Sequence, residues 1–264
     1  MVPIVEAQTF IKVMEGGTTL PWLVICQSDT GPKPYVVKLY KVNFTEQNEV
    51  IFRELVCSHL ADQFDLATPE TVLVQMSPEF LNTLPTQQLV QYRQTTEGLK
   101  LGTAYIEPPY VNYSPALAIE FLKPFDVASV FAFDQCILNK DRREGKPNLL
   151  LKENDVYLID HEICLEGLDV GLKQFKMGLL PHQAFDHLFL NVLQKLPPNE
   201  KQSCFDTFFE YLEKAVNFDG IKQISFHLED HSITCHSTDK IYDYLCALRI
   251  NAASVRNALI RSIQ

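Results

Sequence analysis

Three polar residues near the middle of the chain have the types and the spacing of a metal-dependent active site. Asp141 is followed seven residues later by Asn148, and Asp160 comes after two short apolar runs at 149–151 and 156–159. Two such runs joined by a polar turn are typical of a hairpin, so we expect Asn148 and Asp160 to meet at its base. Amide and carboxylate oxygens are ligands that Mg²⁺ prefers. Asp141 stands across from this site with a role of its own.

The N-terminal part supplies the other groups that phosphoryl transfer from ATP needs, namely a loop over the phosphates and a cation on them. Lys38 lies in the third expected strand, and Glu54 lies on the following expected helix, from where it can hold Lys38 by an ion pair. The turn between the first two expected strands is the place for the loop. That turn contains Gly16, Gly17, Thr18 and Thr19.

The order of these residues along the chain assigns each a role. Asp141 would orient and deprotonate the acceptor hydroxyl, Asn148 and Asp160 would bind Mg²⁺, and Lys38 would contact the α- and β-phosphates. Arg143, two residues after Asp141, either reaches the γ-phosphate or forms a surface salt bridge. Electrostatic stabilisation by the metal and the lysine would carry most of the rate.

Three further residues are predicted to be structural. Asp134 falls on the apolar face of its expected helix, where an unpaired carboxylate is costly, so we expect it to accept hydrogen bonds from the backbone of the catalytic loop. Arg142 is expected to be structural, and His161 is expected to pack or hydrogen-bond locally.

Each candidate residue also has an ordinary structural interpretation. A lysine within a strand usually faces solvent, but Lys38 follows two valines in an apolar run, which favours the phosphate role. Glu49 competes with Glu54 as its partner. The three polar residues of the first motif are also common turn and cap residues. Their joint order and spacing favour the kinase interpretation over three separate structural roles.

The elements around these residues change character along the chain. The first ~75 residues have the short apolar and β-branched runs of strands, with one helix between them. A proline-rich, polar segment at 77–115 resembles a connector or insertion, and the remainder is mostly helical by its periodicity. Strands are expected at 10–14, 22–26, 35–40 and after Pro69, and helices at 49–64, 126–138, 183–196, 200–216 and 240–263.

Composition narrows the class of protein. With 264 residues and 46% hydrophobic residues, the chain can bury a large core. A formal net charge of -10 argues against a general nucleic-acid surface. The seven cysteines form no Cys-x-x-Cys pair, and no apolar stretch approaches membrane-spanning length, so we expect a cytoplasmic protein with free thiols that binds neither nucleic acid nor membrane.

At these residues the sequence resembles the HipA-like kinases, in particular their compact kinase domains. The stretch "FDQCILNKDRREGKPNLLL" is similar to the family's Phe-Asp…Asn-x-Asp-Arg…Asn-Leu-Leu catalytic segment, and "VYLIDHE" is similar to its metal-binding Ile-Asp-His-Gly. "GGTTLPWLV", "YVVKLY" and "VIFRELVCSHLADQFDLATPE" resemble its Gly-rich turn, lysine strand and following helix. The five motifs occur in the family's order between Gly16 and Glu162.

The resemblance implies an α+β, protein-kinase-like two-lobed fold, with a strand-rich N-lobe over 1–107 and a helical C-lobe over 108–264. It implies a kinase that uses ATP and Mg²⁺ to phosphorylate Ser or Thr of a protein. Better-known relatives are toxins that act on a translation factor, so an antitoxin partner is implied as well. Several relatives phosphorylate a hydroxyl of their Gly-rich loop, which points here to Thr18 or Thr19.

One departure from the family pattern keeps other functions open. Glu162 stands where the family usually has glycine, which adds negative charge near the metal site and removes a flexible backbone position. A pseudokinase that binds nucleotide and acts as an interaction module is therefore one alternative. A small-molecule kinase, which uses a similar active site, is a second. A purely structural domain that binds no nucleotide is a third.

Overall fold

The computed structural model describes residues 2–15, 20–42, 44, 49–114, 116–117, 119–181 and 185–264. The chain divides into two compact units, each built from three segments. Unit 1 contains Met1–Leu55, Pro69–Pro108 and Gln223–His236. Unit 2 contains Val56–Thr68, Pro109–Lys222 and Ser237–Gln264. The expected α+β class, strand-rich in its N-terminal region and helical in its C-terminal region, is confirmed.

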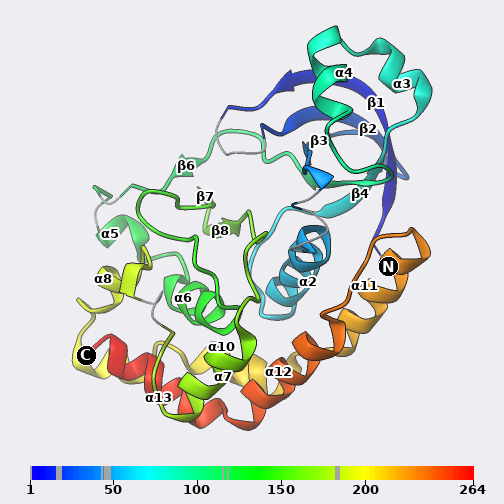
Figure 1. The fold of residues 1–264 in the computed structure, drawn as a ribbon. Helices are drawn as coiled ribbons and strands as arrows, with labels where there is room; N and C mark the ends of the chain where they lie inside the picture. Colours follow the sequence, from blue (N-terminus) through cyan, green and yellow to red (C-terminus); the bar gives the residue numbers. More distant parts are fainter. Residues whose placement is uncertain are drawn as a thin grey trace. The chain divides into compact units, whose positions relative to one another are not determined.

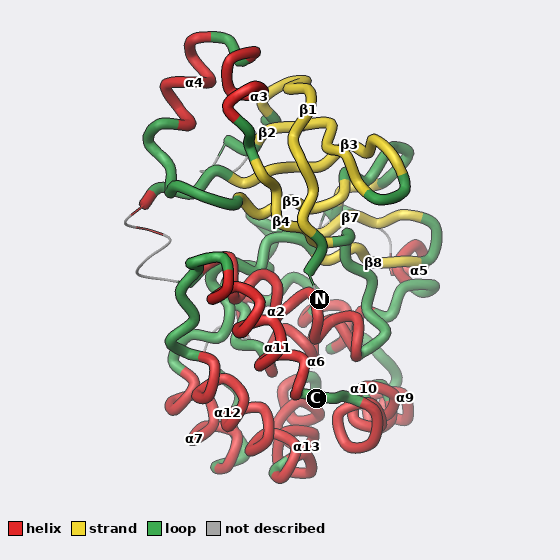
Figure 2. The backbone as a smooth tube through the Cα atoms, turned by 90° about the vertical axis from the view of Figure 1, so that its right-hand side faces the viewer, coloured by secondary structure: helices red, strands yellow, loops and turns green. Residues whose placement is uncertain are grey.

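Unit 1 is built around a closed five-stranded barrel with the strand order β1-β2-β3-β5-β4 (Figure 1). Neighbouring strands are antiparallel except β1 and β4, whose parallel pairing closes the barrel. Figure 2 shows these strands in yellow. The strands are β1 (Ile4–Val13), β2 (Trp22–Ser28), β3 (Gly31–Lys38), β4 (Thr71–Gln75) and β5 (Lys100–Ala104).

The alternation of side chains along β3 decides where Lys38 points. Tyr35 and Val37 are completely buried in the barrel core, whereas Val36 between them is only half-buried. Because successive side chains of a strand face opposite sides, Lys38 leaves the barrel on the side of Val36. Lys38 is the last residue of the strand, which starts earlier and ends earlier than the expected 35–40.

The segment expected to be a connector contributes to this barrel. It forms α3 (Pro78–Thr83), α4 (Thr86–Tyr92) and the barrel strand β5. Sequence periodicity missed β5 because its residues do not alternate: Lys100 is buried, and Gly102 has no side chain. A Cβ at Gly102 would lie 2.7 Å from Cγ2 of Val74, so this side of the barrel closes only around a glycine.

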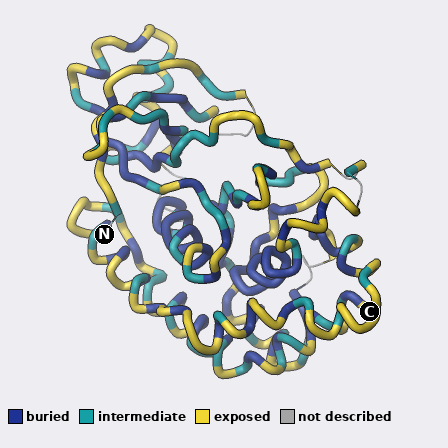
Figure 3. The backbone as a smooth tube through the Cα atoms, turned by 180° about the vertical axis from the view of Figure 1, so that it is seen from behind, coloured by how far each residue is buried: buried dark blue, intermediate teal, exposed yellow. Residues whose placement is uncertain are grey.

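Unit 2 is mostly helical and carries one small antiparallel sheet in the order β6-β7-β8. Its central helix, α6 (Val127–Cys136), starts where the side chain of Asp126 accepts a hydrogen bond from the Ser129 amide, 3.0 Å away. Residues 128–136 of α6 are all buried, as Figure 3 shows in dark blue. The sheet consists of β6 (Val111–Asn112), β7 (Leu149–Lys152) and β8 (Asp155–Leu158).

The remaining helices are shorter and more numerous than periodicity predicted. The stretch expected as one helix over 240–263 forms two, because the chain leaves helical geometry at Asn251. Two helices, α2 and α11, have residues in both units. The helices not yet named are α2 (Val50–Gln63), α5 (Ile119–Leu122), α7 (Leu168–Lys176), α8 (Leu190–Leu193), α9 (Pro198–Ser203), α10 (Asp206–Glu210), the π-helix η2 (Tyr211–Ala215), α11 (Asp219–Asp230), α12 (Thr238–Ile250) and α13 (Ala252–Ser262).

Within the part of the chain that the structure describes, no helix has the length and apolar character needed to cross a membrane.

The buried amine of Lys100 should make the free energy of unfolding of unit 1 vary with pH in the alkaline range. The residue is 1% exposed, donates to the carbonyl of Thr96 and lies 5.0 Å from the centroid of the Tyr92 ring. Burial lowers the pKa of Lys100 from 10.5 to about 8, against a small opposing effect of Glu97. Between these two pKa values the unfolded chain binds more protons than the folded chain, so the free energy of unfolding rises with pH.

We therefore predict that the free energy of unfolding of the wild type increases relative to that of Lys100→Met between about pH 7 and about pH 9.5. Urea titrations at several pH values measure the difference. Lys33→Met is the control, because Lys33 is an exposed lysine in β3. A difference between wild type and Lys100→Met that stays constant over this range would contradict the prediction.

Candidate active site

The hairpin of unit 2 brings two of the predicted metal ligands to its base. Leu149 of β7 pairs with Leu158 of β8, and the next amide, that of Ile159, donates to the carbonyl of Asn148 at 3.1 Å. Asn148 and Asp160 therefore flank the hairpin on its two strands. Both residues have a left-handed backbone, with φ of 47° and 64°. Asn and Asp are among the few non-glycine types that adopt this conformation readily.

Asp141 joins this group through direct side-chain contacts. The amide nitrogen of the Asn148 side chain donates to Oδ2 of Asp141 at 3.1 Å. Lys146, from the same loop, donates to Asp141, and its Nζ lies 3.5 Å from Oδ2 of Asp160. Asp141 and Asp160 thus share the amine of Lys146, and Asn148 joins them through its contact with Asp141.

The carboxylates around Lys146 keep it charged. Partial burial works against the charged amine, but the hydrogen bond to Asp141 and the charges of Asp160 and Glu162 outweigh this effect and raise the pKa of Lys146. Lys146 is therefore a cation at neutral pH. It is a site residue that sequence reasoning missed, although its charge within the loop between Asp141 and Asn148 was visible.

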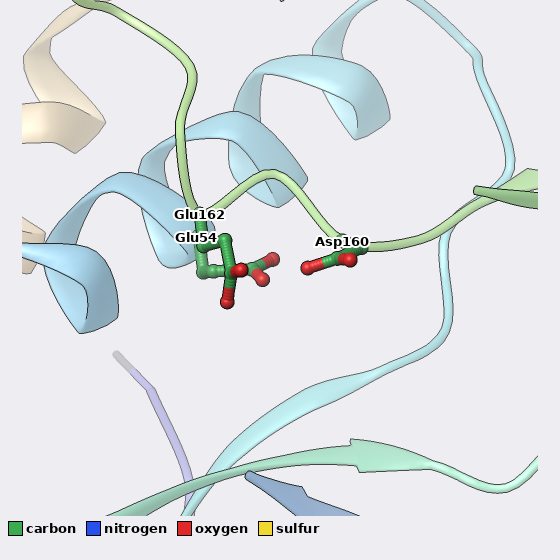
Figure 4. Close-up of side chains that lie close together, drawn as sticks. All are labelled: Glu54, Asp160 and Glu162. Carbon is green, nitrogen blue, oxygen red and sulfur yellow. The ribbon is translucent and has the colours of Figure 1, made fainter. Parts of the chain in front are cut away.

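Asp160 and Glu162 present their carboxylates to the same place. One carboxylate oxygen of each lies within 4.8 Å of the other. Figure 4 draws both, together with Glu54 of α2. Their oxygen atoms are hard ligands of the kind that Mg²⁺ prefers. Glu162 is almost buried, and it adds a possible ligand where the family pattern has none.

A buried polar network under the loop holds Asp141 and Asn148 in place. The carboxylate of Asp134 in α6 is completely buried. It accepts hydrogen bonds from Nε of Arg142 at 2.6 Å, Nε2 of His187 at 2.9 Å and Nδ2 of Asn139 at 2.8 Å. The expectation that backbone groups of the loop would donate to Asp134 was wrong: the donors are side chains.

This network keeps Asp134 ionised. Burial alone would raise the pKa of Asp134, but the charge of Arg142 and the hydrogen bonds from His187 and Asn139 outweigh it and hold the pKa well below its ordinary value. The ring of His187 is held in one tautomer, because its Nδ1 accepts a hydrogen bond from the Phe189 amide at 3.1 Å. Its Nε2 therefore carries the hydrogen that forms the hydrogen bond to Asp134.

Arg142 connects Asp134 to residues on both sides of the hairpin base. Its guanidinium donates to the backbone carbonyl of Asn148 and lies 3.1 Å from Nε2 of His161, which must accept because an arginine can only donate. Asn139 contributes at the other end of the loop, where its side-chain oxygen accepts from the Asp141 amide at 2.9 Å. Arg142 and His161 thus have the structural positions that were expected of them.

In unit 1, Lys38 and Glu54 form the expected ion pair. Nζ of Lys38 donates to Oε1 of Glu54, and the two side chains are 12% and 2% exposed. The competing partner, Glu49, instead accepts a hydrogen bond from the backbone amide of His236. The predicted phosphate loop lies outside the described residues: Gly16, Gly17, Thr18 and Thr19.

Arg143 is the predicted residue that the structure does not bring to the others through its side chain. Its backbone is held in a tight turn, where its amide donates to the carbonyl of Lys146 at 3.2 Å and its carbonyl accepts from the Lys146 amide at 2.9 Å. Its side chain is exposed and, among the described residues, forms no ion pair. The geometry gives Lys146, not Arg143, the contacts with carboxylates.

Comparison with known proteins agrees with this geometry. The family model described as HipA-like kinase matches residues 7–205, which is most of the chain. The chain belongs to the HipA-like kinase family. Its activity class is therefore that of a kinase, a phosphotransferase. None of the curated proteins matches the chain.

A solved structure shows a similar fold. The proinflammatory kinase CtkA of Helicobacter pylori superposes with a TM-score of 0.54 at 15% sequence identity. The match covers 97% of this chain and 96% of that protein. At this identity the likeness concerns the fold alone, and it extends over both units and beyond the part matched by the HipA-like family model.

The Asp134 network leads to a prediction about stability. Replacing Asp134 with Asn leaves the buried charge of Arg142 without its counterion, which should lower the free energy of unfolding at neutral pH by about 3–5 kcal/mol. Urea denaturation measures this loss. The control, Asp169→Asn, makes the same chemical change at an exposed acid that pairs with Lys240 at 2.9 Å, and it should cost at most about 1 kcal/mol.

The same variant tests the sign of the pH dependence. Because the folded pKa of Asp134 is depressed, its contribution is complete above the ordinary value of 3.8 and is lost as the pH falls below it. The difference in unfolding free energy between wild type and Asp134→Asn should therefore shrink as the pH is lowered from about 7 to about 3. An equal difference at both pH values would show that the carboxylate is not stabilised in its ionised form.

Proposed function

We propose that this HipA-like kinase transfers the γ-phosphate of ATP, with Mg²⁺, to a Ser or Thr hydroxyl of a protein in the cytoplasm. The observation that carries the proposal is a set of contacts at the base of one hairpin: Lys146 pairs with Asp141 and Asp160, and Asn148 donates to Asp141. An acceptor for a proton and hard-oxygen ligands for a metal are two of the parts that phosphoryl transfer needs.

The proposed reaction assigns a step to each group of unit 2. Asp141 orients the acceptor hydroxyl and takes its proton as the hydroxyl oxygen bonds to the γ-phosphorus. The bond from that phosphorus to the β–γ bridging oxygen breaks, and ADP leaves. Asn148 and Asp160 would hold Mg²⁺, which when bound neutralises charge on the phosphate oxygens. Glu162 is close enough to Asp160 to share in that binding.

Unit 1 contains the cation that we propose to contact the α- and β-phosphates of ATP. Lys38 is held by Glu54 in a nearly buried ion pair, so its amine has a defined position from which to donate to the α- and β-phosphates. This is the arrangement that kinases use to bind and orient ATP.

The proposed substrate and regulation rest on the family of the chain and not on its site geometry. By its family, the chain is proposed to modify a translation factor, to be controlled by an antitoxin-type partner, and to phosphorylate its own Thr18 or Thr19. A second function, that of a nucleotide-binding pseudokinase, is favoured by one observation: the carboxylate of Glu162 stands near Asp160, where the family pattern has no acid.

Incubation with ATP and Mg²⁺ followed by intact-mass and peptide mass spectrometry tests the proposal. We expect the wild type to gain phosphate, at Thr18 or Thr19 above all, and Asp160→Ala to gain none. The matched control is Asp155→Ala, an exposed acid at the start of β8 in the same hairpin, which should behave as the wild type does.

The same samples, mixed with a cell lysate and radiolabelled ATP, reveal protein substrates. If no protein in the lysate is labelled and the wild type gains no phosphate, yet nucleotide still binds, the pseudokinase function replaces the kinase function. If nucleotide does not bind either, both functions fail.

The role of Lys38 is tested separately. Lys38→Met should lower the rate of phosphoryl transfer by about 100-fold, because a cation on the phosphates is lost. The ADP-release rate at saturating and limiting ATP measures this loss in kcat and in kcat/KM. Lys33→Met, five residues earlier on the same strand, should keep the wild-type rate. Equal rates for Lys38→Met and wild type would remove Lys38 from the proposed reaction.

A further inference from the structure

We propose that Lys146 is an exchangeable cation: its amine neutralises the base Asp141 and the metal ligand Asp160 before metal binds, and then moves to the transferred phosphoryl group once Mg²⁺ occupies Asp160. This inference rests on the proposed function and adds to it a group that contacts the reacting phosphate.

The contacts of Lys146 place one amine between the two acids with different roles. It donates to Oδ2 of Asp141, and it lies 3.5 Å from Oδ2 of Asp160. The same oxygen of Asp141 also accepts from the side chain of Asn148 at 3.1 Å. An amine in this position covers both the atom that would take a proton and an atom that would bind metal.

The backbone and the side chain of Lys146 differ in their freedom. Two hydrogen bonds with Arg143 close the turn at 143–146 and hold the backbone. The side chain is 35% exposed, although it is paired with two acids. A lysine has a flexible four-carbon stem and a compact charge, so the amine can exchange partners while its backbone stays in place.

Charge supplies the reason for the exchange. The carboxylates of Asp141 and Asp160 repel each other, and the Lys146 amine lies within ion-pair distance of both. A divalent cation on Asp160 compensates that acid more strongly and repels the lysine amine. The transferred phosphoryl group then offers the amine new anionic oxygens close to Asp141, which frees Asp141 to accept the proton of the hydroxyl.

If Lys146 has this role, its removal should raise the affinity for metal and lower the rate of phosphoryl transfer. A purely structural ion pair does not predict these opposite effects. Without Lys146, metal no longer competes with the Lys146 amine for Asp160, so the metal binds more tightly in the absence of nucleotide. Phosphoryl transfer becomes slower, because the developing charge loses a cation. A residue that only holds the loop together would weaken both metal binding and transfer when it is removed.

The experiment measures Mn²⁺ binding to the nucleotide-free protein by electron paramagnetic resonance, together with the rate of phosphoryl transfer. Lys146→Met should bind Mn²⁺ about tenfold more tightly and transfer phosphate about 100-fold more slowly. Lys146→Arg keeps the charge, so its Mn²⁺ affinity should stay near that of the wild type. Lys140→Met is the control, since Lys140 pairs with Glu166 at 3.2 Å, and both quantities should be unchanged.

The outcomes separate this inference from the proposed function. If the wild type binds Mn²⁺ and transfers phosphate, but Lys146→Met binds Mn²⁺ with equal or lower affinity, the exchange is wrong and the kinase function stands. The same holds if transfer by Lys146→Met is as fast as in the wild type. If the wild type neither binds Mn²⁺ nor transfers phosphate, the proposed function fails and the inference fails with it. Thermal unfolding of each variant shows that binding is compared between folded proteins.

Discussion

The candidate site depends on one buried ion pair, between Asp134 of α6 and Arg142 of the loop that follows it. Both side chains are shielded from water, so neither charge is tolerable without the other. The remaining oxygens and N–H groups of the pair are then used for hydrogen bonds, which reach His187, Asn139, His161 and the carbonyl of Asn148. Satisfying one buried charge therefore positions several segments that are distant in sequence.

The segments that this network positions are those that carry the proposed chemistry. Asn139 fixes the amide of Asp141, and Arg142 fixes the carbonyl of Asn148. Hairpin pairing between β7 and β8 then sets Asp160 beside Asn148. The contacts from Asn139 and Arg142 use backbone groups of Asp141 and Asn148 and not the side chains that would take part in the reaction. A rigid support for an exposed set of groups is what preorganised catalysis requires.

The barrel of unit 1 positions Lys38 as the buried network positions the residues of the catalytic loop. Closure by the parallel pairing of β1 with β4 fixes which side of β3 faces the core, and Tyr35 and Val37 occupy that side. Lys38 is thereby directed to the outside of the barrel, where it forms an ion pair with Glu54 of α2. In both units the position of the polar residue follows from which of its neighbours must be buried.

The α+β class, the hairpin that brings Asn148 near Asp160 and the ion pair of Lys38 with Glu54 could all be predicted from the sequence, because they follow from local periodicity, turn residues and the order of motifs. Features that depend on residues far apart in the chain could not be predicted in this way. β5 has no alternation and becomes a strand because its neighbours in the barrel pair with it. The partnership of His187 with Asp134 spans 53 residues, and the place of Lys146 between two acids follows from a turn and a hairpin folding together.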